Sequence, residues 1–205
     1  MKKIFKSSLL ATAGATLALG LVTVPSFQAD AVTVSPTVRA IVAAAITLTT
    51  TSQGTSNNVD INLTPGASPV LSSASDTLTV NTNDTLGYLL TLADADTTYT
   101  LTSGGNTIAA SANAIGSGAA LATNTWGFAL PGGTGFDATY SVEANSTTST
   151  SKWSAIPAQG TPYTLKSTST TASNDQTVVW YAAKVDNTKP TGTYTDQVVY
   201  TATAK

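Results

Sequence analysis

The sequence predicts an all-β protein, an antiparallel β-sandwich or barrel, and three observations support this class. Apolar and polar residues alternate with a period of two in many short segments, the pattern of strands with one buried face. Threonine makes up about a fifth of the chain, and its β-branched side chain favours strands. Turn-forming residues separate the segments at near-regular intervals, as in antiparallel all-β domains.

The expected strands follow one another along the whole chain. Residues 86–92 are more continuously apolar than the others, which predicts a more deeply buried strand. The last two segments, 177–183 and 193–203, are expected to pair as a hairpin, because Asn187 and Gly192 between them can supply positive φ. The remaining predicted strands are 46–50, 59–63, 77–80, 98–101, 125–130 and 163–166.

The first 31 residues have the layout of a cleaved secretory signal peptide. Lys2, Lys3 and Lys6 form a positive start, residues 9–24 are apolar without a charge, and Ala29-Asp30-Ala31 provides the small residues of a cleavage site. The apolar run of about 16 residues is shorter than the roughly 20 that span a bilayer. We therefore expect cleavage after Ala31 and a secreted, extracellular or cell-surface chain with no integral membrane span after cleavage.

The chain beyond residue 31 is long enough for one buried domain. We expect residues 32–48 to form an N-terminal extended segment or first strand, and residues 49–205 to form the β-sandwich domain. An alternative is that this domain consists of two packed subdomains. The break between them would then lie in the Ala- and Gly-rich stretch near residues 110–124.

Composition excludes several classes of function. The chain has 9 Lys and Arg against 11 Asp and Glu, so it lacks the basic excess that nucleic-acid binding requires. It has no Cys and no His, which removes zinc sites of the common kinds, thiol nucleophiles and Ser-His-Asp triads. With a single Glu, Glu143, a catalytic pair of carboxylates is also disfavoured. We therefore expect no enzyme and no cofactor.

Two candidate binding features remain. Asp94 and Asp96 lie two residues apart after a predicted strand and are weak candidate Ca²⁺ ligands, although turn aspartates that cap exposed backbone are the favoured interpretation. Trp153 lies between Ser- and Thr-rich segments, so we expect it to be exposed and to face a ligand, unlike the other aromatic residues, which are expected in the core.

Three sequence blocks carry a resemblance. They are residues 76–92, the Asn124-Thr-Trp-Gly-Phe128 stretch and residues 190–204. In this order they resemble a group of poorly characterised secreted and cell-surface proteins of Gram-positive-type and candidate-phylum bacteria, whose blocks read TNxxxGYxLxL, NTWGY and GTYxxxVxYTATA. The resemblance covers residues 76–205 and implies an exported Ig-like or pilin-like β-sandwich at the cell envelope, with no catalytic residues to transfer.

These observations lead to one expected function and one alternative. We expect a non-enzymatic structural or adhesive module that binds a cell-wall glycan or a surface protein at the bacterial envelope. The alternative is a polymerising, pilin-like subunit in which residues 32–51 or the terminal strand complete a neighbour's sheet by strand addition. Self-assembly is then the central interaction.

Overall fold

The computed structural model describes residues 32–54 and 57–205, so the expected signal peptide lies outside the described residues. Residues 42–205 form one compact unit. Its nine strands lie in two sheets, and no α-helix occurs among the described residues. A three-residue 3₁₀ turn, Ser52–Gly54, follows the first strand. The prediction of an all-β protein is confirmed.

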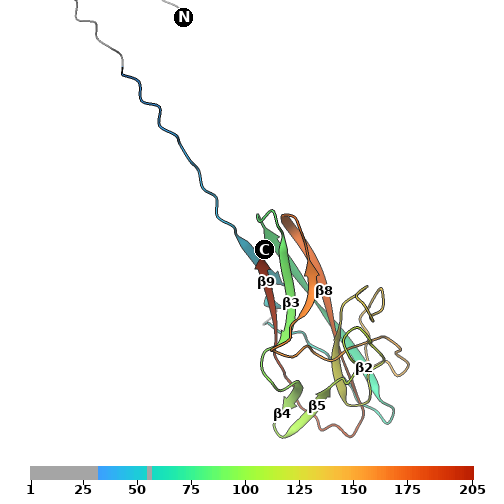
Figure 1. The fold of residues 1–205 in the computed structure, drawn as a ribbon. Coiled ribbons are helices and arrows are strands. Elements are labelled where there is room, and N and C mark those ends of the chain that lie inside the picture. The colour runs from blue at the N-terminus through green and yellow to red at the C-terminus, as the bar shows by residue number, and fades with distance from the viewer. Residues whose placement is uncertain (1–31, 55–56) are drawn as a thin grey trace, which may run out of the picture. The chain divides into compact units, whose positions relative to one another are not determined.

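The larger sheet has six strands and the smaller has three (Figure 1). In spatial order the six-stranded sheet consists of β1 (Ile46–Thr50), β2 (Val70–Thr82), β8 (Ala172–Val185), β6 (Thr125–Ala129), β5 (Asn106–Ala110) and β4 (Thr100–Ser103). The three-stranded sheet consists of β7 (Tyr163–Ser167), β3 (Tyr88–Asp94) and β9 (Val198–Ala204).

Pairing is antiparallel with one exception. β5 and β6 run parallel, so the purely antiparallel sheet that we expected is corrected at this pair. The connection between them, residues 111–124, is long enough to return the chain to the other end of the sheet, as parallel pairing requires. β5 precedes the Ala- and Gly-rich stretch in the sequence and β6 follows it, yet both strands lie in the same sheet.

The hydrophobic core lies between the two sheets. β2 and β8 form the centre of the larger sheet and pair from Val70↔Val185 to Thr82↔Ala172. Leucines of β3 pack against the apolar residues of these two strands in one cluster. Leu78, Val80, Leu90, Leu92 and Val179 are all fully buried. This arrangement is sandwich-like, with apolar residues of the two sheets packed against one another.

The outer face of the larger sheet is partly covered as well. The segment after residue 140 runs along the beginning of β2, where Leu71 and Ser146 exchange two backbone hydrogen bonds of 2.8 Å. Ser73 donates to the Glu143 carbonyl at 2.9 Å, and its hydroxyl accepts the Glu143 N–H at 2.9 Å. The first four residues of β2 are all buried, so both faces of the strand are covered here, whereas its second half alternates.

Two strand predictions are wrong. The segments 177–183 and 193–203 do not form a hairpin, because β8 pairs with β2 and β6 while β9 pairs with β3 in the other sheet. The connection 186–197 carries the chain from one sheet to the other instead. Residues 59–63 keep the alternating burial that predicted a strand but pair with no strand. The other predicted strands are present, residues 46–50 with the predicted ends and the rest with shifted ends.

Residues 32–45 contain no strand, and all of them are exposed. Among the residues that the structure describes, no helix has the length and apolar character needed to cross a membrane.

Candidate functional site

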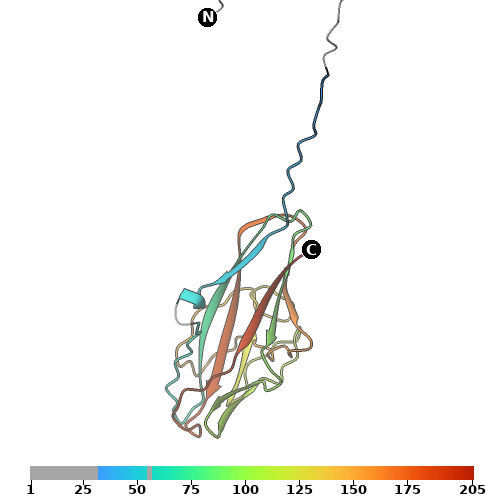
Figure 2. The same cartoon turned by 90° about the vertical axis from the view of Figure 1, so that its left-hand side faces the viewer.

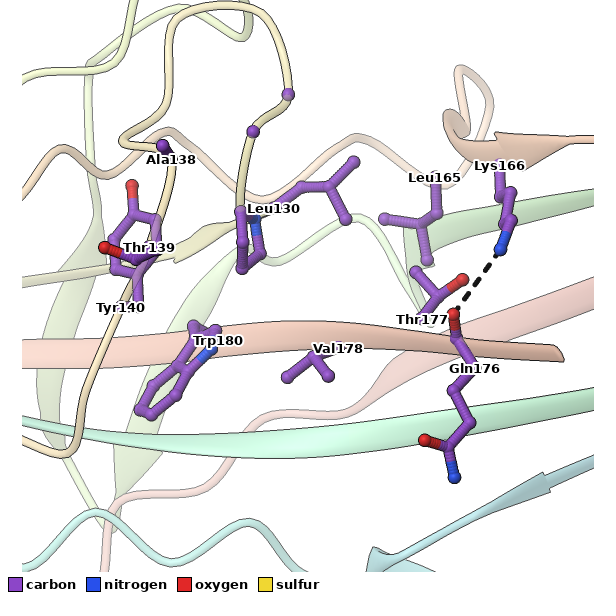
Figure 3. A pocket seen from close by; sticks show the side chains of 13 residues that line it. Leu130, Ala138, Thr139, Tyr140, Leu165, Lys166, Gln176, Thr177, Val178 and Trp180 are labelled. Carbon is purple, nitrogen blue, oxygen red and sulfur yellow. Dashed lines mark hydrogen bonds between the residues drawn. The ribbon is translucent and has the colours of Figure 1, made fainter. Parts of the chain in front are cut away.

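A shallow hollow of about 690 Å³ lies beside the end of β8 (Figure 3). The turn after β6, residues 130–133, forms one wall, and residues 138–140 form a second. β7 contributes Leu165 and Lys166, and β8 contributes residues 176–178 and Trp180. Three segments that are far apart in the sequence therefore meet around one concave surface, which is the kind of place where proteins bind small ligands.

The floor of the hollow is aromatic. The rings of Tyr140 and Trp180 stack with centroids 6.3 Å apart. The Tyr140 hydroxyl donates to the Lys152 carbonyl and accepts the Asp137 N–H at 3.1 Å. Burial raises the pKa of Tyr140 to about 12, so this hydroxyl stays protonated at neutral pH. The Tyr140 ring is thus held in place at one wall of the hollow.

The rim near β7 and β8 is polar. Lys166 forms an ion pair with Asp175 and donates to the Gln176 carbonyl at 3.4 Å. Asp175 also accepts a hydrogen bond of 2.7 Å from Tyr88. Burial by itself raises the pKa of Asp175, but the hydrogen bonds from Lys166 and Tyr88 outweigh it and lower the pKa. The Thr177 hydroxyl in the same wall is buried without a partner.

This combination of groups is suited to binding. Apolar ring surface with a few polar groups at the rim suits a sugar ring or an extended peptide. Asp175, whose carboxylate lies next to the hollow, is held by two partners. Nothing in the sequence patterning singled out this surface, because its walls come together only through the sheet arrangement.

The expectation that Trp153 faces a ligand is wrong. Trp153 is fully buried, and its ring packs edge-on against Tyr140 with centroids 5.2 Å apart. Backbone hydrogen bonds join residue 153 to Ala119 and residue 154 to Phe128. The surrounding Ser and Thr residues suggested an exposed loop, but these bonds hold the segment against β6 and place the indole in the core. Its Nε1 group has no hydrogen-bond partner.

Asp94 and Asp96 lie at the end of β3, where Asp94 is almost fully buried and Asp96 is exposed. An oxygen of Asp94 accepts the Asp96 N–H at 2.9 Å, and an oxygen of Asp96 accepts the Thr98 N–H. Both therefore make the turn contacts of the favoured interpretation. No group of three or more metal-ligating side chains occurs within residues 32–54 and 57–205. Calcium binding stays a prediction.

The structure adds Asp196 to this pair, a residue that the sequence did not single out. Asp94 pairs with Val198 across β3 and β9, which places Asp196 nearby. One carboxylate oxygen of Asp94 and one of Asp196 are buried without a hydrogen-bond partner. Burial, and then the charges of Asp94 and Asp96, raise the pKa of Asp196 to about 6. Burial likewise raises the pKa of Asp94.

Comparison with known proteins found no matching family model, no matching curated protein and no matching solved structure. The resemblance of the three sequence blocks therefore stays a prediction.

Proposed function

We propose that this chain is a secreted or cell-surface, non-enzymatic structural or adhesive module that binds a glycan or protein partner at the bacterial envelope. The fold proposed for it is an Ig-like or pilin-like variety of sandwich. The observation that carries the proposal is the hollow of about 690 Å³ with its Tyr140 and Trp180 floor. The absence of His and Cys from the sequence supports a binding role over a catalytic one.

A cell-wall glycan is the first partner to test. The exposed residues Thr139 and Gln176 line the hollow from the 138–140 segment and from β8, so a bulky charged side chain at either position changes its lining. We expect purified chain to sediment with cell-wall glycan, and Gln176→Arg to lose most of this binding. Thr164→Arg is the matched control, because Thr164 is an exposed residue of the neighbouring strand β7 that does not line the hollow.

Equal sedimentation of the Gln176→Arg and Thr164→Arg variants would exclude the hollow as the binding surface. If the unaltered chain fails to sediment, the same three proteins should be compared in pull-downs from envelope extract. If the unaltered chain and Thr164→Arg both retain a protein that Gln176→Arg does not, that protein binds at the hollow.

A second function is favoured by a different observation. Residues 32–45 are exposed and belong to no strand although five of them are large apolar residues, namely Val32, Val34, Val38, Ile41 and Val42. An exposed apolar stretch of this size commonly marks an interaction site. We propose as the alternative a polymerising, pilin-like subunit that assembles by strand addition. Fractionation of native cells tests it, because a ladder of species in unboiled SDS extract is expected of a polymer.

A further inference from the structure

β1 and β9 are each the last strand of their sheet, and they approach each other without pairing (Figure 2). Among the described strands, β9 pairs only with β3 and β1 pairs only with β2. Edge strands carry a row of backbone groups that are ready to pair with another chain.

The hydrogen bonds determine which backbone groups of β9 face this edge. The Ala95 N–H donates to the Gln197 carbonyl, and the Lys205 N–H donates to the Gly87 carbonyl. Residues 197 and 205 therefore direct their backbone groups toward β3, and by the alternation of an antiparallel ladder so do the odd-numbered residues between them. The even-numbered residues, Val198, Tyr200, Ala202 and Ala204, direct theirs toward the open edge.

The same four residues are incompletely covered. Their side chains are half-buried, whereas the odd-numbered side chains of β9 are exposed. On the neighbouring strand β3, by contrast, Leu90 and Leu92 are fully buried. β9 thus presents both free backbone groups and half-covered side chains at the open edge, which are the two features that a further strand would satisfy.

The chain itself contains a segment with the complementary pattern. In residues 32–44 every even-numbered residue is apolar, and the odd-numbered ones are Thr33, Ser35, Thr37, Arg39, Ile41 and Ala43. The phase continues into β1, where the even-numbered side chains are the more buried ones. Pro36 has no N–H and interrupts a paired strand. The usable stretch is therefore residues 38–44, which is as long as β9.

We propose that residues 38–44 of one copy of this chain add to the free edge of β9 in a second copy. This inference rests on the second function proposed above and specifies its donor and acceptor. The side chains of the even-numbered donor residues then lie over the half-covered core; these residues are Val38, Ala40, Val42 and Ala44. Their backbone groups form hydrogen bonds with the even-numbered residues of β9. Because donor and acceptor are different surfaces, each copy binds one neighbour and is bound by another, which yields an open chain.

The contact that Ala43 makes within its own copy is compatible with this arrangement. Its carbonyl accepts a hydrogen bond of 3.0 Å from the Asn83 side chain, and the Ala45 carbonyl accepts the Asn83 N–H at 3.3 Å. The odd-numbered residues therefore direct their backbone groups toward β2 of their own copy. The opposite edge of the segment, with residues 42 and 44, is left for the neighbour.

Two single substitutions separate donor from acceptor. Val38→Asp places a charge on the apolar face of the donor, and Thr37→Asp is the matched control with the same charge one residue before the donor begins. Ala202→Pro removes an N–H that faces the open edge and leaves the β3 ladder intact. If that variant unfolds at lower urea concentration than the unaltered chain, Ala204→Pro at the end of the strand replaces it. All are examined in the full secreted chain by light scattering after size exclusion.

The unaltered chain and Thr37→Asp are expected to form multimers, and Val38→Asp and Ala202→Pro to be monomers. A mixture of the two monomers should yield a dimer and nothing larger, because only one donor and one acceptor remain intact. A monomeric unaltered chain at all concentrations would overturn the proposal, as would multimers that persist in Ala202→Pro. Glycan binding by monomeric Val38→Asp would show that the adhesive function holds independently of assembly.

Discussion

At the scale of single residues, the hydroxyl groups of Tyr181 and Tyr200 connect the two sheets. Tyr181 lies on β8 and Tyr200 on β9, and their oxygens are 2.7 Å apart. Burial raises the pKa of each phenol well above its usual value, so both remain protonated and one donates to the other. This is a buried polar contact between the sheets, where an unpaired hydroxyl is costly.

Replacing either tyrosine by Phe should destabilise the fold. We expect Tyr181→Phe or Tyr200→Phe to lower the free energy of unfolding by about 1–2 kcal/mol, because one buried hydroxyl is left without its partner. The double variant should lose less than the sum of the two, since no orphaned hydroxyl remains. Urea unfolding of all four proteins measures this coupling. Additive losses would contradict a direct bond between the two groups.

A second residue-scale prediction concerns Asp196, whose pKa is raised to about 6 by burial and by nearby Asp94 and Asp96. The folded protein then holds a proton that the unfolded chain, with an aspartate pKa near 3.9, releases. Between about pH 4 and pH 6 the free energy of unfolding should fall as the pH rises. Asp196→Asn should remove the contribution of this group to the pH dependence of the free energy of unfolding. At pH 7.5 the variant should be more stable than the unaltered chain by about 1 kcal/mol, a figure reduced for solvent screening.

Urea unfolding across this pH range checks the prediction. Asp60→Asn is the control, because Asp60 is exposed and its replacement changes the net charge by the same amount. If both variants follow the pH dependence of the unaltered chain, Asp196 is not the group that titrates.

At the scale of elements, β6 depends on a glycine that permits close packing. A Cβ atom added at Gly127 would lie 2.4 Å from the Ser154 carbonyl oxygen, and Ser154 exchanges two backbone hydrogen bonds with the adjacent Phe128. The segment that buries Trp153 can approach β6 only because position 127 has no side chain.

Gly127→Ala should therefore displace this segment from β6 and lower the free energy of unfolding by about 1–3 kcal/mol. Gly160→Ala is the control, because an added Cβ there meets no atom within 4 Å and is expected to change stability by less than about 0.5 kcal/mol. Thermal or urea unfolding compares the two. A Gly127→Ala protein as stable as the control would show that the segment adjusts without loss of packing.

At the scale of the whole molecule, one core serves both sheets. Trp126, Trp153 and Trp180 all belong to the cluster that includes residues of β2, β3 and β8. Strands on both sides of residues 111–124 lie in the same sheet. A domain organised in this way is expected to unfold in one cooperative step.

We expect far-UV circular dichroism and tryptophan fluorescence to report coincident urea transitions. The three tryptophans are at most 9% exposed, so their fluorescence follows loss of the shared core. Two separate transitions would instead support two packed subdomains with a break near residues 110–124.

The class of fold and most of its strands can be predicted from the amino-acid sequence. Period-two alternation predicts β1 and the second half of β2 because a strand with one buried face places every second residue in the core. Composition alone excludes thiol and histidine chemistry, since the chain has neither Cys nor His. The apolar pattern of residues 32–44 is also visible in the sequence, and it is the basis of the assembly proposal.

Strand partners and the burial of individual aromatic residues, by contrast, depend on the tertiary structure. β8 and β9 look like a hairpin because they are neighbours in sequence, yet they lie in different sheets and meet through Tyr181 and Tyr200. Trp153 lies among polar residues, yet backbone bonds from distant segments bury it. Alternation specifies which face of a strand is buried, whereas strand partners and surfaces such as the hollow depend on long-range contacts that local pattern does not encode.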